Sequence, residues 1–87
     1  TLDANTSGTH NTALGQSALG ANTTGGSNSA FGYGALDANS TGGNNNAFGY
    51  GALSASTVSD SNAFGAFSLH NNTFIDCWLN WSKFTWN

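Results

Sequence analysis

Few side chains in this 87-residue chain have the chemistry for acid–base catalysis, nucleophilic attack or metal binding. It has two histidines, His10 and His70, and one cysteine, Cys77. A catalytic or metal centre needs several such groups brought together. The histidines hold different positions of a repeated sequence, and Cys77 has no second cysteine for a metal cluster or an intrachain disulfide. We therefore expect no metal site and no cofactor, and we predict that the chain is not an enzyme.

Charge and hydropathy argue against two kinds of interaction, nucleic-acid binding and a membrane-spanning helix. Lys83 is the single basic residue, against Asp3, Asp37, Asp60 and Asp76, and the net charge is -3. One cation cannot neutralise a phosphate backbone, so we expect no nucleic-acid partner. No apolar run approaches the roughly 20 residues that a membrane-spanning helix needs, so we expect no membrane span.

Asn-x-Ser/Thr sequences are the remaining candidates for chemistry, as acceptors of N-linked glycans. They begin at Asn5, Asn22, Asn39, Asn71 and Asn80. The first three are evenly spaced along the sequence, so a regular stack would place them in a column on one face. The alternative is that Asn-Thr and Asn-Ser occur here as turn residues, which bond to their own backbone.

These candidates lie on a sequence that repeats itself. The segment N-T-A-L-G-Q-S-A-L, from Asn11, returns as N-S-A-F-G-Y-G-A-L from Asn28 and as N-N-A-F-G-Y-G-A-L from Asn45. A fourth copy begins at Ser61, and residues 2–10 match the second half of a unit. A unit of about 17 residues is too short for two helices and a turn, and its Gly and Asn disfavour helix. The prediction is an all-β solenoid over residues 1–73, whose coils each hold two short strands joined by tight turns.

Two apolar columns are predicted to build the core of this solenoid. The first consists of Leu14, Phe31, Phe48 and Phe64, and the second of Leu2, Leu19, Leu36, Leu53 and Leu69. Within a unit the two positions are separated by an odd number of steps, so a straight strand would point them to opposite faces. A bend at the glycine between them would turn both inward. Without the bend, the first column would fill the coil and the second would contact a neighbouring chain.

The C-terminal segment, residues 74–87, has a different composition, F-I-D-C-W-L-N-W-S-K-F-T-W-N. Its candidates for assembly contacts are Trp78, Trp81, Phe84 and Trp86. One interpretation is a cap that covers the open end of the solenoid. The second is an assembly segment whose alternating residues add a strand to the edge of a neighbouring subunit, and the third is a disordered tail.

Self-association is the expected source of stability. A domain of this size without a disulfide buries little surface alone, which favours a homo-oligomer or a filament. Threonines also align in the repeat, at Thr6, Thr23, Thr57 and Thr73 with Ser40 in the same column, which suggests an ice-binding surface as a minor alternative.

The units N-S-A-F-G-Y-G-A-L and N-N-A-F-G-Y-G-A-L resemble the head repeats of trimeric autotransporter adhesins and, more closely, longer-period repeats of phage and algal-virus fibre proteins. This resemblance implies a left-handed parallel β-roll, usually of three chains around one axis, on a cell or virion surface. The implied role is adhesion and spacing without catalysis. The chain is therefore predicted to be a structural subunit of an extracellular or virion surface fibre. The alternative is a trimeric adhesin or tail-fibre head that binds a cell-surface receptor or a glycan.

Overall fold

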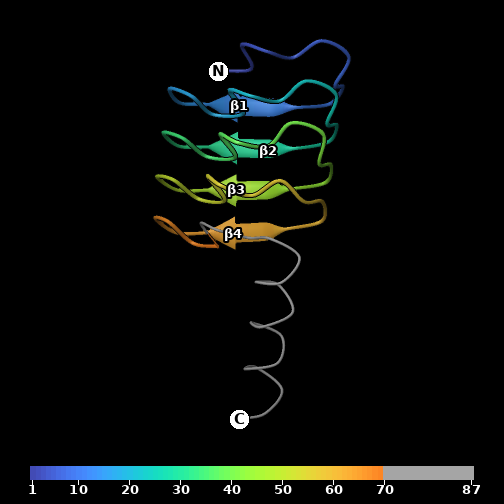
Figure 1. The fold of residues 1–87 in the computed structure, drawn as a ribbon. Helices are drawn as coiled ribbons and strands as arrows, with labels where there is room; N and C mark the ends of the chain where they lie inside the picture. The colour runs from blue at the N-terminus through green and yellow to red at the C-terminus, as the bar shows by residue number, and fades with distance from the viewer. Residues whose placement is uncertain (70–87) are drawn as a thin grey trace, which may run out of the picture.

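The computed structural model describes residues 1–69 of the chain. These residues contain four strands of three residues each: β1 (Thr12–Leu14), β2 (Ser29–Phe31), β3 (Asn46–Phe48) and β4 (Asn62–Phe64). The strands form one parallel sheet in the order β1-β2-β3-β4, with one strand from each repeat (Figure 1). The described part of the protein is therefore all-β, with an arrangement typical of a β-solenoid.

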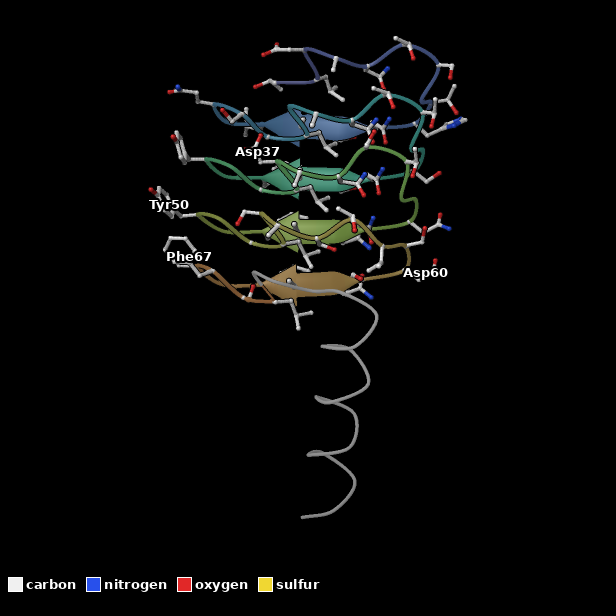
Figure 2. All side chains as sticks on the ribbon, in the orientation of Figure 1. Asp37, Tyr50, Asp60 and Phe67 are labelled. Carbon is white, nitrogen blue, oxygen red and sulfur yellow. The ribbon has the colours of Figure 1, made fainter. Side chains whose placement is uncertain are left out.

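The register of the sheet follows the sequence repeat. Ala13 of β1 pairs with Ala30, Ala30 with Ala47, and Ala47 with Ala63. Equivalent residues of successive units thus become neighbours in space, and their side chains line up in columns along the stack (Figure 2). A residue type that recurs at one repeat position consequently forms a column along the described stack.

A glycine ends each strand and turns the chain sharply. Gly32, directly after β2, has a φ of +129°, a backbone conformation that residues with a side chain rarely adopt. Its backbone also lies against the next coil, because a Cβ on Gly32 would stand 2.6 Å from the carbonyl oxygen of Gly49. The corner therefore needs glycine for two reasons, its conformation and its closeness to the neighbouring coil.

The return side of each coil carries no second strand within the described residues, contrary to the prediction of two strands per coil. Its leucines adopt a left-handed conformation, with φ of 52° at Leu19 and 54° at Leu36. The coils still bond to one another there, since the Leu19 N–H donates to the Ala35 carbonyl at 2.9 Å. A left-handed residue interrupts the pleat, so this side is held by single backbone bonds and not by a sheet ladder.

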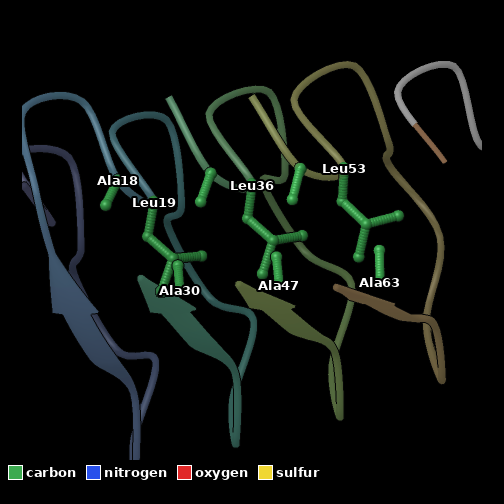
Figure 3. Packing of buried hydrophobic residues seen from close by; sticks show 9 residues of the cluster. Ala18, Leu19, Ala30, Leu36, Ala47, Leu53 and Ala63 are labelled. Atoms are coloured by element: carbon green, nitrogen blue, oxygen red, sulfur yellow. The ribbon is translucent and has the colours of Figure 1, made fainter. Parts of the chain in front are cut away.

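The core lies between the sheet and this return side. Leu19, Leu36 and Leu53 are fully buried and pack against strand alanines such as Ala30 and Ala47 (Figure 3). The same cluster includes the buried alanines that precede the leucines, Ala18, Ala35 and Ala52. Leu2 and Leu69, at the two ends of the described stack, are partly buried against it. Each coil thus encloses one leucine and several alanines.

The first apolar column lies outside the core, so its predicted position was wrong. Leu14 and Phe64 are 66% and 69% exposed, and Phe31 and Phe48 are partly exposed. The alanine in the middle of each strand points inward, and alternation therefore sends the next residue outward. The bend at the glycine exists, but it turns only the leucine column into the core. The narrow interior of leucine and alanine has no place for a stack of phenyl rings.

Candidate interaction surface

The outward side chains of the first column form a continuous apolar stack, which we call the Phe column (Leu14, Phe31, Phe48 and Phe64). The rings of Phe31 and Phe48 have centroids 4.6 Å apart and planes within 6° of parallel. Those of Phe48 and Phe64 are 4.7 Å apart and within 3°. The backbone fixes this spacing, since the Gly49 N–H donates to the Phe31 carbonyl at 2.8 Å. The result is an apolar stripe on the outer face of the sheet.

A second aromatic column lies at the corner of the coil and was not singled out in the sequence. Tyr33 and Tyr50 stack with centroids 5.1 Å apart and planes 14° from parallel. Phe67 follows in the next coil and meets Tyr50 edge to face at 5.2 Å. These side chains project from the outer edge of the coils, where Figure 2 labels Tyr50 and Phe67. The recurrence of tyrosine at one repeat position was the signal for this pairing.

The strand positions beside the Phe column carry polar, uncharged side chains. The other outward position of the strands holds Thr12, Ser29, Asn46 and Asn62. There the side-chain amide of Asn46 donates to the Asn62 Oδ1 at 2.7 Å. Among the charged residues of the described part, Asp60 lies on the far side of the stack from Tyr50 (Figure 2). Within the strands, the apolar stripe is therefore bordered by neutral polar side chains.

The predicted glycan column is instead an internal asparagine ladder. Asn22 and Asn39 are fully buried. The Asn22 Nδ2 donates to Asn5 Oδ1 at 2.9 Å and to the Gly25 carbonyl at 3.0 Å. The Asn39 Nδ2 likewise donates to Asn22 Oδ1 at 3.0 Å and to the Gly42 carbonyl at 2.9 Å. A glycan needs this same nitrogen and has no room in the interior, so the glycan interpretation was wrong at Asn22 and Asn39. The bonds to the Gly25 and Gly42 carbonyls agree with the turn interpretation.

Asn5 begins this ladder at the end of the described stack and is only partly buried. Its Nδ2 donates to the Gly8 carbonyl at 3.0 Å, and its Oδ1 accepts from Asn22. At the other end Ser56 takes the place of asparagine, and the ladder stops. The buried Asn39 Oδ1 and Ser56 Oγ have no hydrogen-bond partner in the described residues.

A second column of asparagines strengthens the same side of the coil. Asn28 and Asn45 are fully buried. The Asn28 backbone N–H donates to Asn11 Oδ1 at 3.0 Å, and the Asn45 N–H donates to Asn28 Oδ1 at 3.0 Å. In the last described coil the Ser61 N–H donates to Asn45 Oδ1 at 2.9 Å. Buried amides are thus satisfied by the neighbouring coil, which ties each coil to the next.

Asn5→Ala is expected to cost about 1 kcal/mol of stability, because Asn22 Nδ2 loses an acceptor and the Gly8 carbonyl loses a donor. The cost is moderate because water reaches this end of the ladder. Urea unfolding measures it, with Gln16→Ala at an exposed position as a control that should stay within about 0.5 kcal/mol of the wild type. Equal stability of the two variants would show that the ladder does not stabilise the first coil.

The threonine column behind the ice-binding alternative uses its hydroxyl groups internally. The Thr6 Oγ1 donates to the Thr23 carbonyl at 3.1 Å. The Thr23 Oγ1 lies 3.2 Å from the Ser40 carbonyl and 3.1 Å from the Ser40 Oγ. Hydroxyls that bond to the next coil are less available to order water at the surface. This geometry supports a structural use of the column.

The residues considered for catalysis form no cluster in the described chain. His10 Nδ1 lies 3.1 Å from the hydroxyl of Thr9, its sequence neighbour. Residues 1–69 contain no group of three or more His, Cys, Asp or Glu side chains placed to hold a metal ion. In the same residues no helix is long and apolar enough to cross a bilayer.

The remaining candidates lie outside the described residues. They are His70, Asn71, Thr73, Asp76, Cys77, Trp78, Asn80, Trp81, Lys83, Phe84 and Trp86. The cap, assembly and tail interpretations of residues 74–87 therefore stay predictions. No protein-family model, no curated protein and no solved structure matches the chain.

Proposed function

We propose that the protein is a structural subunit of a fibre on a cell or virion surface, a left-handed β-roll that self-associates by stacking coils of different copies. The observation that carries this proposal is the identity of the contacts between successive coils. Successive coils bond through equivalent backbone atoms, and the coils before Ser56 also bond through equivalent asparagines. A surface that binds the next coil of its own chain is therefore suited to bind an equivalent coil of another chain.

Within the described residues β1 is a terminal strand of the sheet and pairs on one side only, with β2, so we assign the stacking contact to its other side. The Thr12 N–H donates toward β2, to the Asn28 carbonyl at 2.8 Å. Alternate N–H groups of a parallel strand point to opposite sides, so the Ala13 N–H points away from β2. Among residues 1–69 no strand pairs with this side of β1. Edge strands of this kind are templates for pairing with another chain.

Ala13→Pro is expected to abolish filaments while leaving the subunit folded. Proline removes the outward N–H of β1 and places a ring where a stacked strand would approach. An edge strand tolerates proline because no internal bond depends on that N–H. Electron microscopy of the purified wild-type chain should show filaments with a regular axial repeat, and the variant should show short particles only.

Two comparisons make this experiment decisive. Circular dichroism should give matching spectra for Ala13→Pro and the wild type, and Thr12→Ser, with an unchanged backbone donor, should still form filaments. Filaments of normal length from the Ala13→Pro chain would contradict stacking at β1. Discrete short rods from the wild type would contradict the fibre proposal itself.

The second candidate is a trimeric adhesin or receptor-binding head, and the Phe column favours it. An exposed apolar stripe along the stack suits lateral packing of a few chains around one axis. Sedimentation would then give a discrete trimer, and the Phe31→Thr/Phe48→Thr variant would sediment as a monomer. An unchanged trimer in that variant would rule out the Phe column as the contact.

A further inference from the structure

The chain has two tyrosines, and the fold brings them together. Tyr33 and Tyr50 belong to successive repeats, and their rings stack with centroids 5.1 Å apart. Their relative exposures are 49% and 53%, so half of each side chain is open to solvent. The equivalent positions in the coils before and after hold Gln16 and Ala66, so the pair is isolated within its column.

The backbone holds this pair in register. The Gly51 N–H donates to the Tyr33 carbonyl at 2.8 Å, and the Phe67 N–H donates to the Tyr50 carbonyl at 2.8 Å. On the far side of Tyr50, the ring of Phe67 packs at 76° and limits the motion of the tyrosine away from its partner. The backbone therefore holds the two phenols side by side, and each remains half exposed to an oxidant in solution.

We propose that Tyr33 and Tyr50 are a site of oxidative cross-linking, which joins the second and third coils through a dityrosine bond. The co-reactant is a one-electron oxidant, such as a haem peroxidase supplied with hydrogen peroxide. Each phenol loses one electron and one proton to give a tyrosyl radical. The two radicals couple through the carbons next to the phenol oxygens, and the coupled rings tautomerise back to phenols. The chain loses two hydrogen atoms, and one hydrogen peroxide is reduced to two waters.

The geometry favours this coupling over reaction between chains. A radical on Tyr33 meets the Tyr50 ring at contact distance, whereas a phenol of another chain must first diffuse to it. The bond would close a loop that spans one repeat and so restrict the unfolded chain, as a disulfide does. A single cysteine leaves the chain without an intramolecular disulfide, so this pair offers a covalent link between coils. The inference needs only one folded chain and does not depend on fibre assembly.

The test is to treat the dilute full-length chain with horseradish peroxidase and hydrogen peroxide. We expect dityrosine fluorescence, a monomer whose mass has fallen by two hydrogen atoms, and a proteolytic peptide pair joined at Tyr33 and Tyr50. The yield should not change with chain concentration, and the midpoint of thermal unfolding should rise. Peptide mapping separates this product from oxidised tryptophan, of which the chain has three.

A relocation variant supplies the matched control. Gln16→Tyr/Tyr33→Phe keeps two tyrosines in the same column but places them two coils apart, with a phenyl ring between them. Its intramolecular yield should fall at least tenfold, while intermolecular coupling at high concentration stays comparable. Tyr50→Phe should give no intramolecular product. Equal intramolecular yields from the wild type and the relocation variant, or no linked monomer from the wild type, would overturn the proposal.

Discussion

Replacing Leu36 by alanine is expected to destabilise the protein by about 2–5 kcal/mol, the range for large-to-small changes in a core. Leu36 is fully buried in the middle of the leucine column, between Leu19 and Leu53. Its other neighbours are alanines, whose short side chains cannot move in to fill the space. A small domain has only about 5–15 kcal/mol of stability, so the variant should be partly unfolded at moderate temperature.

The same chemical change at Leu14 is the matched control. Leu14 lies on the outer sheet face and is 66% exposed, so Leu14→Ala should change stability by no more than about 0.5 kcal/mol. Urea unfolding of both variants, at concentrations where the chain is dispersed, measures the difference. Similar losses at the two positions would mean that the leucine column is not the main source of apolar stabilisation.

Gly32→Ala is the second change with a large expected effect, a loss of about 3 kcal/mol or more. A residue with a side chain at a φ of +129° carries strain of about 1–3 kcal/mol. The new Cβ would also stand 2.6 Å from the Gly49 carbonyl oxygen and 2.7 Å from its carbon, so two coils would have to separate. That separation would weaken the bond from the Gly49 N–H to the Phe31 carbonyl and disturb the Phe column.

Gly34, two residues later, is the control position. It tests whether the loss of stability comes from the close packing at Gly32 or from the replacement of any glycine with positive φ. It also has a positive φ, of +68°, but a Cβ there would meet no atom within 4 Å. Ser17 adopts nearly the same φ, 65°, at the equivalent position one coil earlier. Gly34→Ser should therefore cost only about 1 kcal/mol. Thermal unfolding compares the two variants, and equal midpoints would contradict the close packing of coils at Gly32.

The stacking of the coils could be predicted from the period of the sequence. Equivalent alanines of successive units pair across the sheet, as the repeat requires. The burial of the leucine column was also predicted, from the regular recurrence of leucine at one repeat position. Both follow from the same physical argument, that a short unit must stack on copies of itself to bury an apolar face.

The orientation of the Phe column could not be predicted from apolar character alone. Phenylalanine is more apolar than alanine, yet Ala47 points inward and Phe48 outward. A strand as short as β3 does not show by its alternation pattern which face is buried. The deciding factor is the width of the coil, which is set by Leu36 and Leu53 on the opposite side. Their left-handed backbone lies outside the rules for helices and strands.

The asparagines show a similar limit. An Asn-x-Ser/Thr sequence reads the same whether the amide faces solvent or the interior. Asn22 and Asn39 differ from a solvent-exposed asparagine because the equivalent position of the neighbouring coil also holds asparagine. That asparagine supplies a hydrogen-bond partner for the buried amide. Recurrence at one repeat position was therefore the signal for a ladder, whereas the two interpretations considered were turn residues and a column of glycans.

The asparagine ladder also makes the molecule electrically directional. At each step the amide of the later coil donates to the oxygen of the earlier one, from Asn39 to Asn22 and from Asn22 to Asn5. Aligned amide dipoles add head to tail, as peptide dipoles do in a helix, and each bond polarises the next. The ladder ends where Ser56 takes the place of asparagine, so each subunit carries one such row of dipoles with a fixed direction. A rod of subunits stacked in one orientation would repeat this direction along its axis and would have two unlike ends.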